Sequence, residues 1–135
     1  MTYAPKEMLK LAKEAMKNAY SPYSNFNVGV CIKTEDGSLY AGCNIENAAY
    51  TMMIHAEASA IAAMISQSGR QKITEVVVIG SSDIPCPPCG TCRQLLSEFS
   101  DPKTLIHMYS IDNQAPITKT LGELLPMSFS GEFLT

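Results

Sequence analysis

The sequence has no long apolar segment and no large excess of charge of either sign. Its 135 residues are 46% hydrophobic and 17% charged, and ten Lys and Arg against thirteen Asp and Glu give a net charge of −3. No stretch of about 18 uncharged apolar residues occurs, so a membrane-spanning helix is not expected. Without a run of basic residues, a polyanionic partner such as nucleic acid is not expected either.

The sequence also lacks the marks of an exported protein. Six charged residues are spread through its first twenty positions, where a signal peptide needs an apolar block. Its five cysteines are an odd number, and three of them fall between positions 86 and 92, which does not fit a disulfide framework. They are typical of reduced thiols in the cytosol, some of them on a metal ion. The sequence therefore predicts a soluble cytoplasmic protein.

The length fits one compact domain over residues 1–135, and no linker, internal repeat or low-complexity tract divides the chain. A chain of this size buries roughly two-thirds of its unfolded surface on folding, which is enough to hold a core without disulfides or a structural metal. A metal ion bound to this chain is therefore expected to take part in catalysis.

The spacing of apolar residues predicts an α/β fold, in which helices cover both faces of a sheet. Helical spacing occurs over residues 8–19, 55–67 and 89–99. Strands are expected near 26–32, 39–43, 76–79 and 104–109, with turns at 36–37 and 112–114. The continuous β-branched run at 76–79 indicates a central strand. A short helix is expected from Thr120, which forms a capping box pattern with Glu123.

Two short segments carry side chains suited to a single metal site. His55, Ala56 and Glu57 open the second predicted helix, and Cys89 and Cys92 open the third. One imidazole and two thiolates suit Zn²⁺, and three protein ligands leave a coordination position open, as in catalytic zinc sites. The two cysteines share a helical face near an N-terminus, where the macrodipole favours thiolates. Glu57 is then available to move protons.

Taken singly, these residues have ordinary structural explanations. Cys89 and Cys92 also continue an apolar stripe, since a buried thiol behaves as a small hydrophobe. Positions i and i+2 lie about 200° apart on a helix, so His55 and Glu57 can face one site only if the helix begins close to His55. Taken together, the two segments match the zinc deaminase pattern of His-x-Glu followed by Pro-Cys-x-x-Cys.

At these residues the chain resembles the cytidine deaminase family, in its short single-domain form, over nearly its whole length. The matching segments are Tyr20–Ser24 with Phe26 and Val28–Gly29, Gly42–Tyr50, Cys92–Gln94, and Glu123–Pro126 with Phe129. The resemblance implies a three-layer α-β-α sandwich around a mixed central sheet of about five strands. It also implies a Zn²⁺ cofactor held by His55, Cys89 and Cys92, and hydrolytic deamination of cytidine or 2′-deoxycytidine in pyrimidine salvage, with Glu57 as the catalytic residue.

The resemblance further implies which residues contact the small-molecule nucleoside. Asn44 and Glu46 would hydrogen-bond the ribose 3′-hydroxyl, and Phe26 would lie against the pyrimidine. The amide of Ala56 would donate to the reacting group. Phe129 would reach into a neighbouring subunit and stack on the base, as the homotetramer of the family requires.

Two positions depart from the short family type, which commonly has cysteine in place of His55 and arginine in place of Ala58. The changes are electrostatically consistent, because three thiolates on Zn²⁺ carry a net negative charge that arginine would offset, whereas one imidazole and two thiolates are neutral. The His-Ala-Glu motif is similar to that of the longer, dimeric branch of the family. A homodimer therefore remains an alternative to the homotetramer. Cys86 could pair with Cys89, but the two prolines between them predict an extended path that leaves Cys86 a buried or idle thiol.

Three alternatives share parts of this pattern. A tRNA adenosine deaminase has the same zinc motif, but an acidic chain without a basic face does not favour a polyanionic substrate. A blasticidin S-type deaminase is similar in size but resembles segment 44–47 poorly. A non-catalytic zinc or redox module would use Cys86, Cys89 and Cys92, and would have no use for Glu57. His107 lies in a predicted strand without a motif and is left outside the site.

Overall fold

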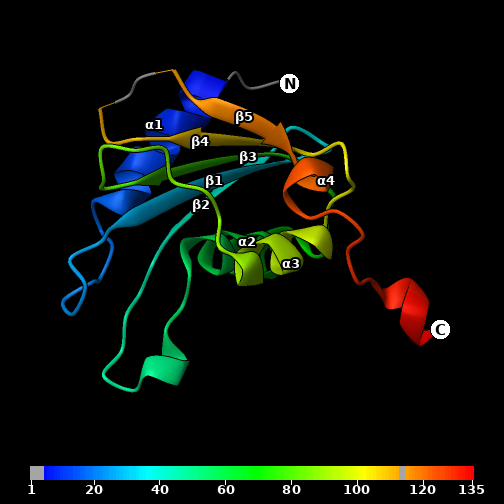
Figure 1. Ribbon diagram of the computed structural model, residues 1–135, viewed down its shortest axis with the longest axis horizontal. Helices are drawn as coiled ribbons and strands as arrows, with labels where there is room; N and C mark the ends of the chain where they lie inside the picture. Colours follow the sequence, from blue (N-terminus) through cyan, green and yellow to red (C-terminus); the bar gives the residue numbers. More distant parts are fainter. Residues whose placement is uncertain (1–4, 113–114) are drawn as a thin grey trace.

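The computed structural model describes residues 5–112 and 115–135, and within them a mixed five-stranded sheet has the order β2-β1-β3-β4-β5 (Figure 1). The strands are β1 (Val28–Thr34), β2 (Leu39–Cys43), β3 (Ile73–Gly80), β4 (Leu105–Tyr109) and β5 (Ile117–Thr120). β3 and β4 run parallel, and the other neighbours are antiparallel. The predicted central strand is β3.

Helices cover both faces of the sheet because successive residues of its central strands point to opposite faces and are apolar on each. Cys31 and Val77 face α1 (Pro5–Met16), whereas Val30 and Val78 face α2 (Ala56–Ser68). α3 (Gly90–Ser97) packs beside α2 (Figure 1). The short elements are η1 (Tyr50–Met52), α4 (Leu121–Leu124) and η2 (Gly131–Leu134). The predicted three-layer α-β-α sandwich is confirmed.

A glycine in β2 brings the start of α2 close to the sheet. A Cβ on Gly42 would lie 2.4 Å from the backbone nitrogen of Ala60 and 2.8 Å from the carbonyl oxygen of Ala56. Any larger residue would push the first turns of α2 away from the strand. The end of α2 that carries the predicted site residues is therefore held by backbone packing against β2.

Most boundaries follow the sequence predictions. The capping box at Thr120 is present, since its hydroxyl accepts from the backbone N–H of Glu123 and the Glu123 side chain accepts from the N–H of Thr120. α1 ends at Met16, three residues before the predicted end. The turn expected at 112–114 includes residues 113 and 114, which lie outside the described residues.

In the part of the chain that is described, no helix is long and apolar enough to cross a membrane.

A polar cluster crosses the sheet from β1 to β5 on the face that carries α1. Lys33 Nζ lies 2.5 Å from Glu75 Oε1, and Glu75 Oε2 lies 2.7 Å from His107 Nε2. His107 Nδ1 is 2.9 Å from the hydroxyl of Thr118. Burial favours a higher pKa for Glu75, but the hydrogen bonds and charges of Lys33 and His107 together outweigh it and lower the pKa. His107 thus belongs to this cluster.

Replacing Glu75 by glutamine should destabilise the protein in a pH-dependent way. At pH 7, Glu75→Gln is expected to lower the free energy of unfolding by about 2 kcal/mol, because Lys33 and His107 lose their carboxylate partner. Since folding depresses the pKa of Glu75, its contribution is complete above the ordinary glutamate pKa and is lost as the pH falls through the depressed value. Urea denaturation from about pH 7 to about pH 3 should show the difference shrinking. The exposed Glu14→Gln is the matched control, and a pH-independent difference for Glu75→Gln would contradict the account.

Candidate active site

The residues that the sequence singled out lie where two helices begin. His55 is the N-cap of α2 and Cys89 is the N-cap of α3, and both have extended backbone. The prediction that a helix begins close to His55 is confirmed. Because His55 lies just outside the helix body, its ring and the Glu57 side chain can face the same space. Cys92 lies three residues after Cys89, one turn into α3.

His55, Cys89 and Cys92 form a compact donor cluster. His55 Nδ1 lies 3.4 Å from Cys89 Sγ and 3.3 Å from Cys92 Sγ. The donor atoms of all three residues lie within 4.8 Å of one another. Tetrahedral zinc with a Zn–N distance of about 2.0 Å and a Zn–S distance of about 2.3 Å separates nitrogen from sulfur by about 3.5 Å. The three side chains are therefore positioned to bind one zinc ion.

The surroundings of Cys92 make its thiolate dependent on a cation. Its side chain is buried, and this burial, followed by the charge of nearby Glu57, raises the pKa of the Cys92 thiol. A divalent ion bound by this cluster would favour the thiolate and release its proton. The chemistry of the donor set thus fits a metal ion better than it fits a free thiol pair.

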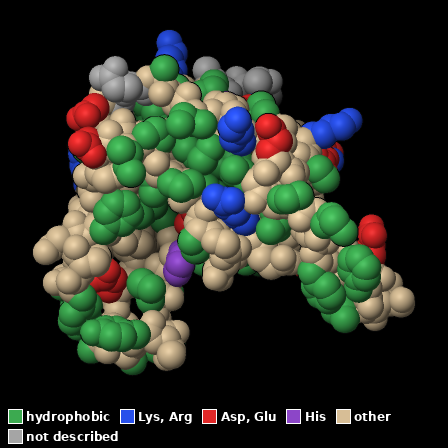
Figure 2. All heavy atoms as spheres, viewed as in Figure 1, with side chains coloured by type: hydrophobic (Ala, Val, Ile, Leu, Met, Phe, Trp, Pro, Cys, Tyr) green, Lys and Arg blue, Asp and Glu red, His purple; other side chains and the backbone are tan. Residues whose placement is uncertain are grey.

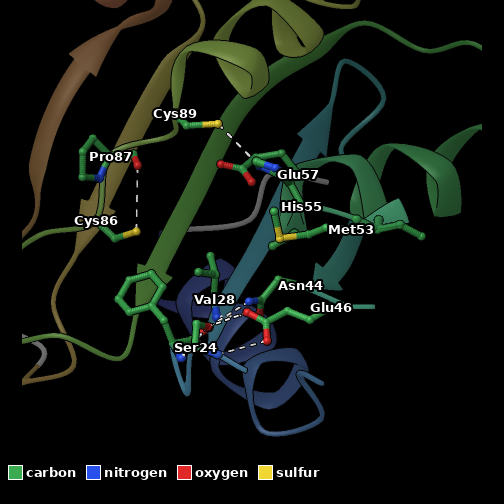
Figure 3. A pocket seen from close by; sticks show the side chains of 13 residues that line it. Ser24, Val28, Asn44, Glu46, Met53, His55, Glu57, Cys86, Pro87 and Cys89 are labelled. Carbon is green, nitrogen blue, oxygen red and sulfur yellow. Dashed lines mark hydrogen bonds between the residues drawn. The ribbon is translucent and has the colours of Figure 1, made fainter. Parts of the chain in front are cut away.

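Glu57 lies in the first turn of α2 and is only 4% exposed. In Figure 3 its carboxylate points into the space beside His55 and Cys89. A carboxylate in the first turn of a helix is favoured by the macrodipole. The chain therefore holds a buried acid–base group next to the donor cluster.

A cavity of about 330 Å³ opens beside these groups. This volume lies in the range of small-molecule sites, about 300–1,000 Å³. Seven of the predicted site residues line it: Phe26, Asn44, Glu46, His55, Ala56, Glu57 and Cys89 (Figure 3). Cys92 joins them through the donor cluster. The fold thus brings together segments near residues 26, 45, 56 and 89.

Asn44 connects the cavity to the beginning of β1. Its Oδ1 accepts a hydrogen bond of 2.9 Å from the N–H of Val28, and its Nδ2 donates one of 2.8 Å to the carbonyl of Phe26. The amide has a second N–H with which it can donate to a ligand. Asn44 therefore fixes the backbone beside Phe26 and can also contact a substrate.

Phe26 and Cys86 share one wall of the cavity and pack on a glycine of β3. A Cβ on Gly80 would lie 2.8 Å from Cζ of Phe26 and 3.0 Å from Sγ of Cys86. Burial, with the charges of Glu57 and Cys89, raises the pKa of the Cys86 thiol to about 11. As predicted, Cys86 lies outside the donor cluster. It is half-buried and lines the cavity, so the prediction of a buried thiol is not met, whereas an idle role for Cys86 stays a prediction.

Phe129 is 56% exposed and does not line the cavity of its own chain. Gln94 Nε2 donates to its carbonyl over 3.0 Å, and its ring stacks on Phe133 with the centroids 5.5 Å apart. The C-terminal segment carrying both rings projects away from the body of the molecule (Figure 1). The predicted role of Phe129 therefore needs a second subunit.

Sequence reasoning missed several residues of the cavity wall. They are Ser24, Val28, Met53, Ile54, Cys86 and Pro87. Ser24 and Val28 lie in segments that carried the family resemblance, which is the signal that could have identified them. Met53 and Ile54 directly precede His55, but no motif distinguishes them from ordinary apolar residues.

Comparison with known proteins places this site in a family. Residues 3–108 match the family model described as the cytidine and deoxycytidylate deaminase zinc-binding region. A curated cytidine deaminase of Sporosarcina psychrophila is 36% identical over 129 residues, covering 96% of this chain and 93% of that protein. One of Halalkalibacterium halodurans is 37% identical over 126 residues, covering 93% of each chain.

Solved structures agree with the sequence comparison. The crystal structure of cytidine deaminase from Burkholderia pseudomallei matches with a TM-score of 0.87 at 32% identity, covering 94% of this chain and 100% of that chain. The cytidine deaminase of Mycobacterium tuberculosis matches with a TM-score of 0.81 at 31% identity, covering 94% of this chain and 98% of that chain. The fold and the zinc-type donor cluster beside a glutamate define a zinc-dependent deaminase. Within that class, the chain belongs to the cytidine deaminase family.

Proposed function

We propose that this protein is a hydrolase that converts cytidine and 2′-deoxycytidine to the uridine nucleosides and ammonia, in pyrimidine salvage. Residues 1–135 act as one catalytic domain, with His55, Cys89 and Cys92 as zinc ligands. The observation that carries the proposal is the buried Glu57 carboxylate beside the donor cluster and the cavity. These three side chains would hold the zinc ion, which would lower the pKa of water and so supply hydroxide near neutral pH.

Glu57 acts as the proton carrier of the reaction. Its carboxylate accepts a proton from the attacking water and delivers it to N3 of the cytosine ring as the hydroxide adds to C4. It then accepts the proton of the new C4 hydroxyl and delivers it to the amino group, so that ammonia leaves as the C4 carbonyl forms. The buried position beside the cavity keeps bulk water from competing for that proton. Ala56 begins α2 and lines the cavity, and its N–H would donate to the reacting group.

The cavity suits a neutral nucleoside because it offers hydrogen bonds and an aromatic wall. Asn44 and Glu46 provide a donor and an ionised acceptor for the sugar hydroxyls, and Phe26 lies against the pyrimidine. A phosphate-free substrate needs directional hydrogen bonds in place of a cluster of cations. A competition assay measuring ammonia release from cytidine, 2′-deoxycytidine, blasticidin S and adenosine tests this choice. Cytidine or 2′-deoxycytidine should be preferred, and a preference for blasticidin S or adenosine would contradict the proposal.

The alternatives considered from the sequence are not favoured. A non-catalytic module built on three cysteines does not fit, because Cys86 lies outside the donor cluster and Glu57 faces the cavity. The family match is to cytidine and deoxycytidylate deaminases over residues 3–108. We further propose a cytoplasmic location, because five cysteines, three of them between positions 86 and 92, do not fit the disulfide framework of an exported protein.

We further propose a homotetramer, with a homodimer as the alternative. Apolar side chains gather on two projections of the molecule, the loop around η1 and the C-terminal segment (Figure 2). Tyr50 is 80% exposed on the first, and Phe133 is 69% exposed on the second. Apolar surface of this kind marks a protein interface. Further copies of this chain fit it, because Phe129 lies away from its own cavity and the proposed site needs an aromatic lid.

Removing the chain from Phe129 onward should weaken nucleoside binding without removing zinc. The Michaelis constant for cytidine is expected to rise about 3- to 10-fold, because an aromatic stacking pair contributes about 0.5–1.5 kcal/mol. Steady-state kinetics with zinc analysis of the same sample measures both effects. Truncation after Phe129, which keeps that ring, is the matched control.

A mixing experiment shows whether Phe129 acts across an interface. Glu57→Gln subunits combined with subunits lacking Phe129 should form some sites with an intact Glu57 and a neighbour's Phe129, so activity should rise above the sum of the parts. A protein that light scattering shows to be a monomer, and that is fully active in the same buffer, would contradict the proposed assembly.

A further inference from the structure

We propose that Ser24 is a positioning residue for nucleoside binding, whose hydroxyl holds the Glu46 carboxylate in the orientation that accepts a sugar hydroxyl. The inference rests on the proposed function of the cavity and adds Ser24, which acts on the substrate only through Glu46. Ser24, Phe26 and Glu46 all line the cavity (Figure 3).

The protein holds both oxygens of the Glu46 carboxylate. Oε1 accepts from the backbone N–H of Tyr23 over 2.9 Å and from that of Ser24 over 3.2 Å. Oε2 accepts from the hydroxyl of Ser24 over 2.5 Å. The carboxylate plane is therefore fixed by three donors from two adjacent residues, and only one of these donors is a side chain.

The same hydroxyl links the carboxylate to the aromatic wall of the cavity. While it donates its proton to Glu46, the Ser24 oxygen accepts a hydrogen bond of 3.0 Å from the N–H of Phe26. A hydroxyl that donates and accepts at once strengthens both bonds by polarisation. The proposed sugar acceptor and the proposed base wall thus share one serine.

Ser24 and Glu46 are 22 positions apart, and backbone contacts bring their loops together. Tyr20 N–H donates to the carbonyl of Asn44 over 3.0 Å, and Glu46 N–H donates to the carbonyl of Tyr20 over 2.7 Å. Within the first loop, Asn25 has a φ of 58°, and its N–H bonds to the carbonyl of Ser21 over 2.9 Å. The left-handed residue closes the turn that directs Ser24 back toward Glu46.

These contacts determine what kind of ligand Glu46 can take. The hydrogen bond from Ser24, helped by the two backbone amides, lowers the pKa of Glu46. An ionised carboxylate only accepts hydrogen bonds, and its remaining lone pairs need an O–H or N–H donor. Because Ser24 occupies one side of Oε2, the direction left for a ligand is fixed. Glu46 would therefore select a sugar hydroxyl at one position.

The test compares Ser24→Ala with Ser81→Ala in steady-state kinetics. Ser81 is a matched control, because its hydroxyl accepts a hydrogen bond of 3.0 Å from the N–H of Asn27, which lies in the same loop as Ser24. Among the described contacts, the Ser81 hydroxyl has none with Glu46. Ser24→Ala should raise the Michaelis constant for cytidine about 3- to 10-fold with kcat changed less than about twofold, the worth of one hydrogen bond. Ser81→Ala should leave the Michaelis constant within about twofold of wild type.

Two further arms separate positioning from loop stability. Ser24→Thr keeps the hydroxyl and should bind cytidine nearly as wild type does. Ser24→Val has the shape of threonine without the hydroxyl and should raise the Michaelis constant as Ser24→Ala does. In a Glu46→Ala background, Ser24→Ala should add less than about a twofold further loss of kcat/KM, because its route to the substrate is gone. Equal effects of Ser24→Ala and Ser81→Ala, or multiplicative effects with Glu46→Ala, would overturn the inference. A wild-type enzyme that leaves cytidine unchanged would instead contradict the proposed function itself.

Discussion

Glu57→Gln is expected to keep its zinc and to lose at least about 10²- to 10⁴-fold in turnover, the usual contribution of a positioned acid–base group. Glutamine has the shape of glutamate but cannot accept the proton of the attacking water. Because Glu57 is buried at the start of α2 and beside the donor cluster, no bulk-water base replaces it easily. Stopped assays of uridine formation, with metal analysis of the same protein, measure both properties.

The control for this variant is Glu98→Gln, which changes an exposed carboxylate on the C-terminal side of α3. It should retain wild-type turnover. A Glu57→Gln protein that deaminates cytidine at nearly the wild-type rate would remove Glu57 from the mechanism, even if the zinc site were correct.

Replacing any one of the three donors should release the metal. Wild-type protein is expected to hold about one zinc per chain, and His55→Ala, Cys89→Ala and Cys92→Ala should each hold far less and lose activity, since two protein ligands remain. Cys86→Ala is the matched control, because Cys86 lines the same cavity outside the donor cluster. Mass spectrometry of metal content after dialysis makes the measurement.

The pattern of losses identifies the ligands. Zinc lost from Cys86→Ala but kept by His55→Ala would move the site toward the three cysteines and reject the set proposed here. Zinc lost from all four variants would indicate that the cavity wall, and not ligation alone, holds the metal.

Local signals in the sequence predicted the site because its main residues begin helices. His55 and Cys89 are N-caps, and Glu57 and Cys92 lie in the first turns that follow. Helix starts depend on nearby residues, so spacing alone could place these groups on the correct elements. That the two helix starts meet is a tertiary fact, which the sequence indicated only through the zinc-ligand chemistry of the two segments and their match to a known pattern.

Features that depend on distant contacts were harder to predict. β5 is four residues long and mostly exposed, so it lacks the alternation that marks a half-buried strand. The backbone N–H of Cys86 donates to the carbonyl of Tyr109 over 3.1 Å, and this contact holds Cys86 at the cavity wall. The two prolines that follow Cys86 predict only a local extended path and say nothing about this distant partner. The hydrogen bonds of Ser24 to Glu46 likewise join segments that the sequence separates.

The zinc-loaded protein is expected to deaminate cytidine by hydrolysis, with Glu57 moving the protons. The most direct test incubates zinc-loaded wild-type protein and zinc-loaded Glu57→Gln with cytidine in ¹⁸O-labelled water and analyses the nucleoside by ultraviolet absorbance and mass. Wild type should convert cytidine to uridine carrying one labelled oxygen, while Glu57→Gln leaves cytidine nearly unchanged. An unaltered cytidine spectrum with the zinc-loaded wild type, or uridine without the label, would contradict the account.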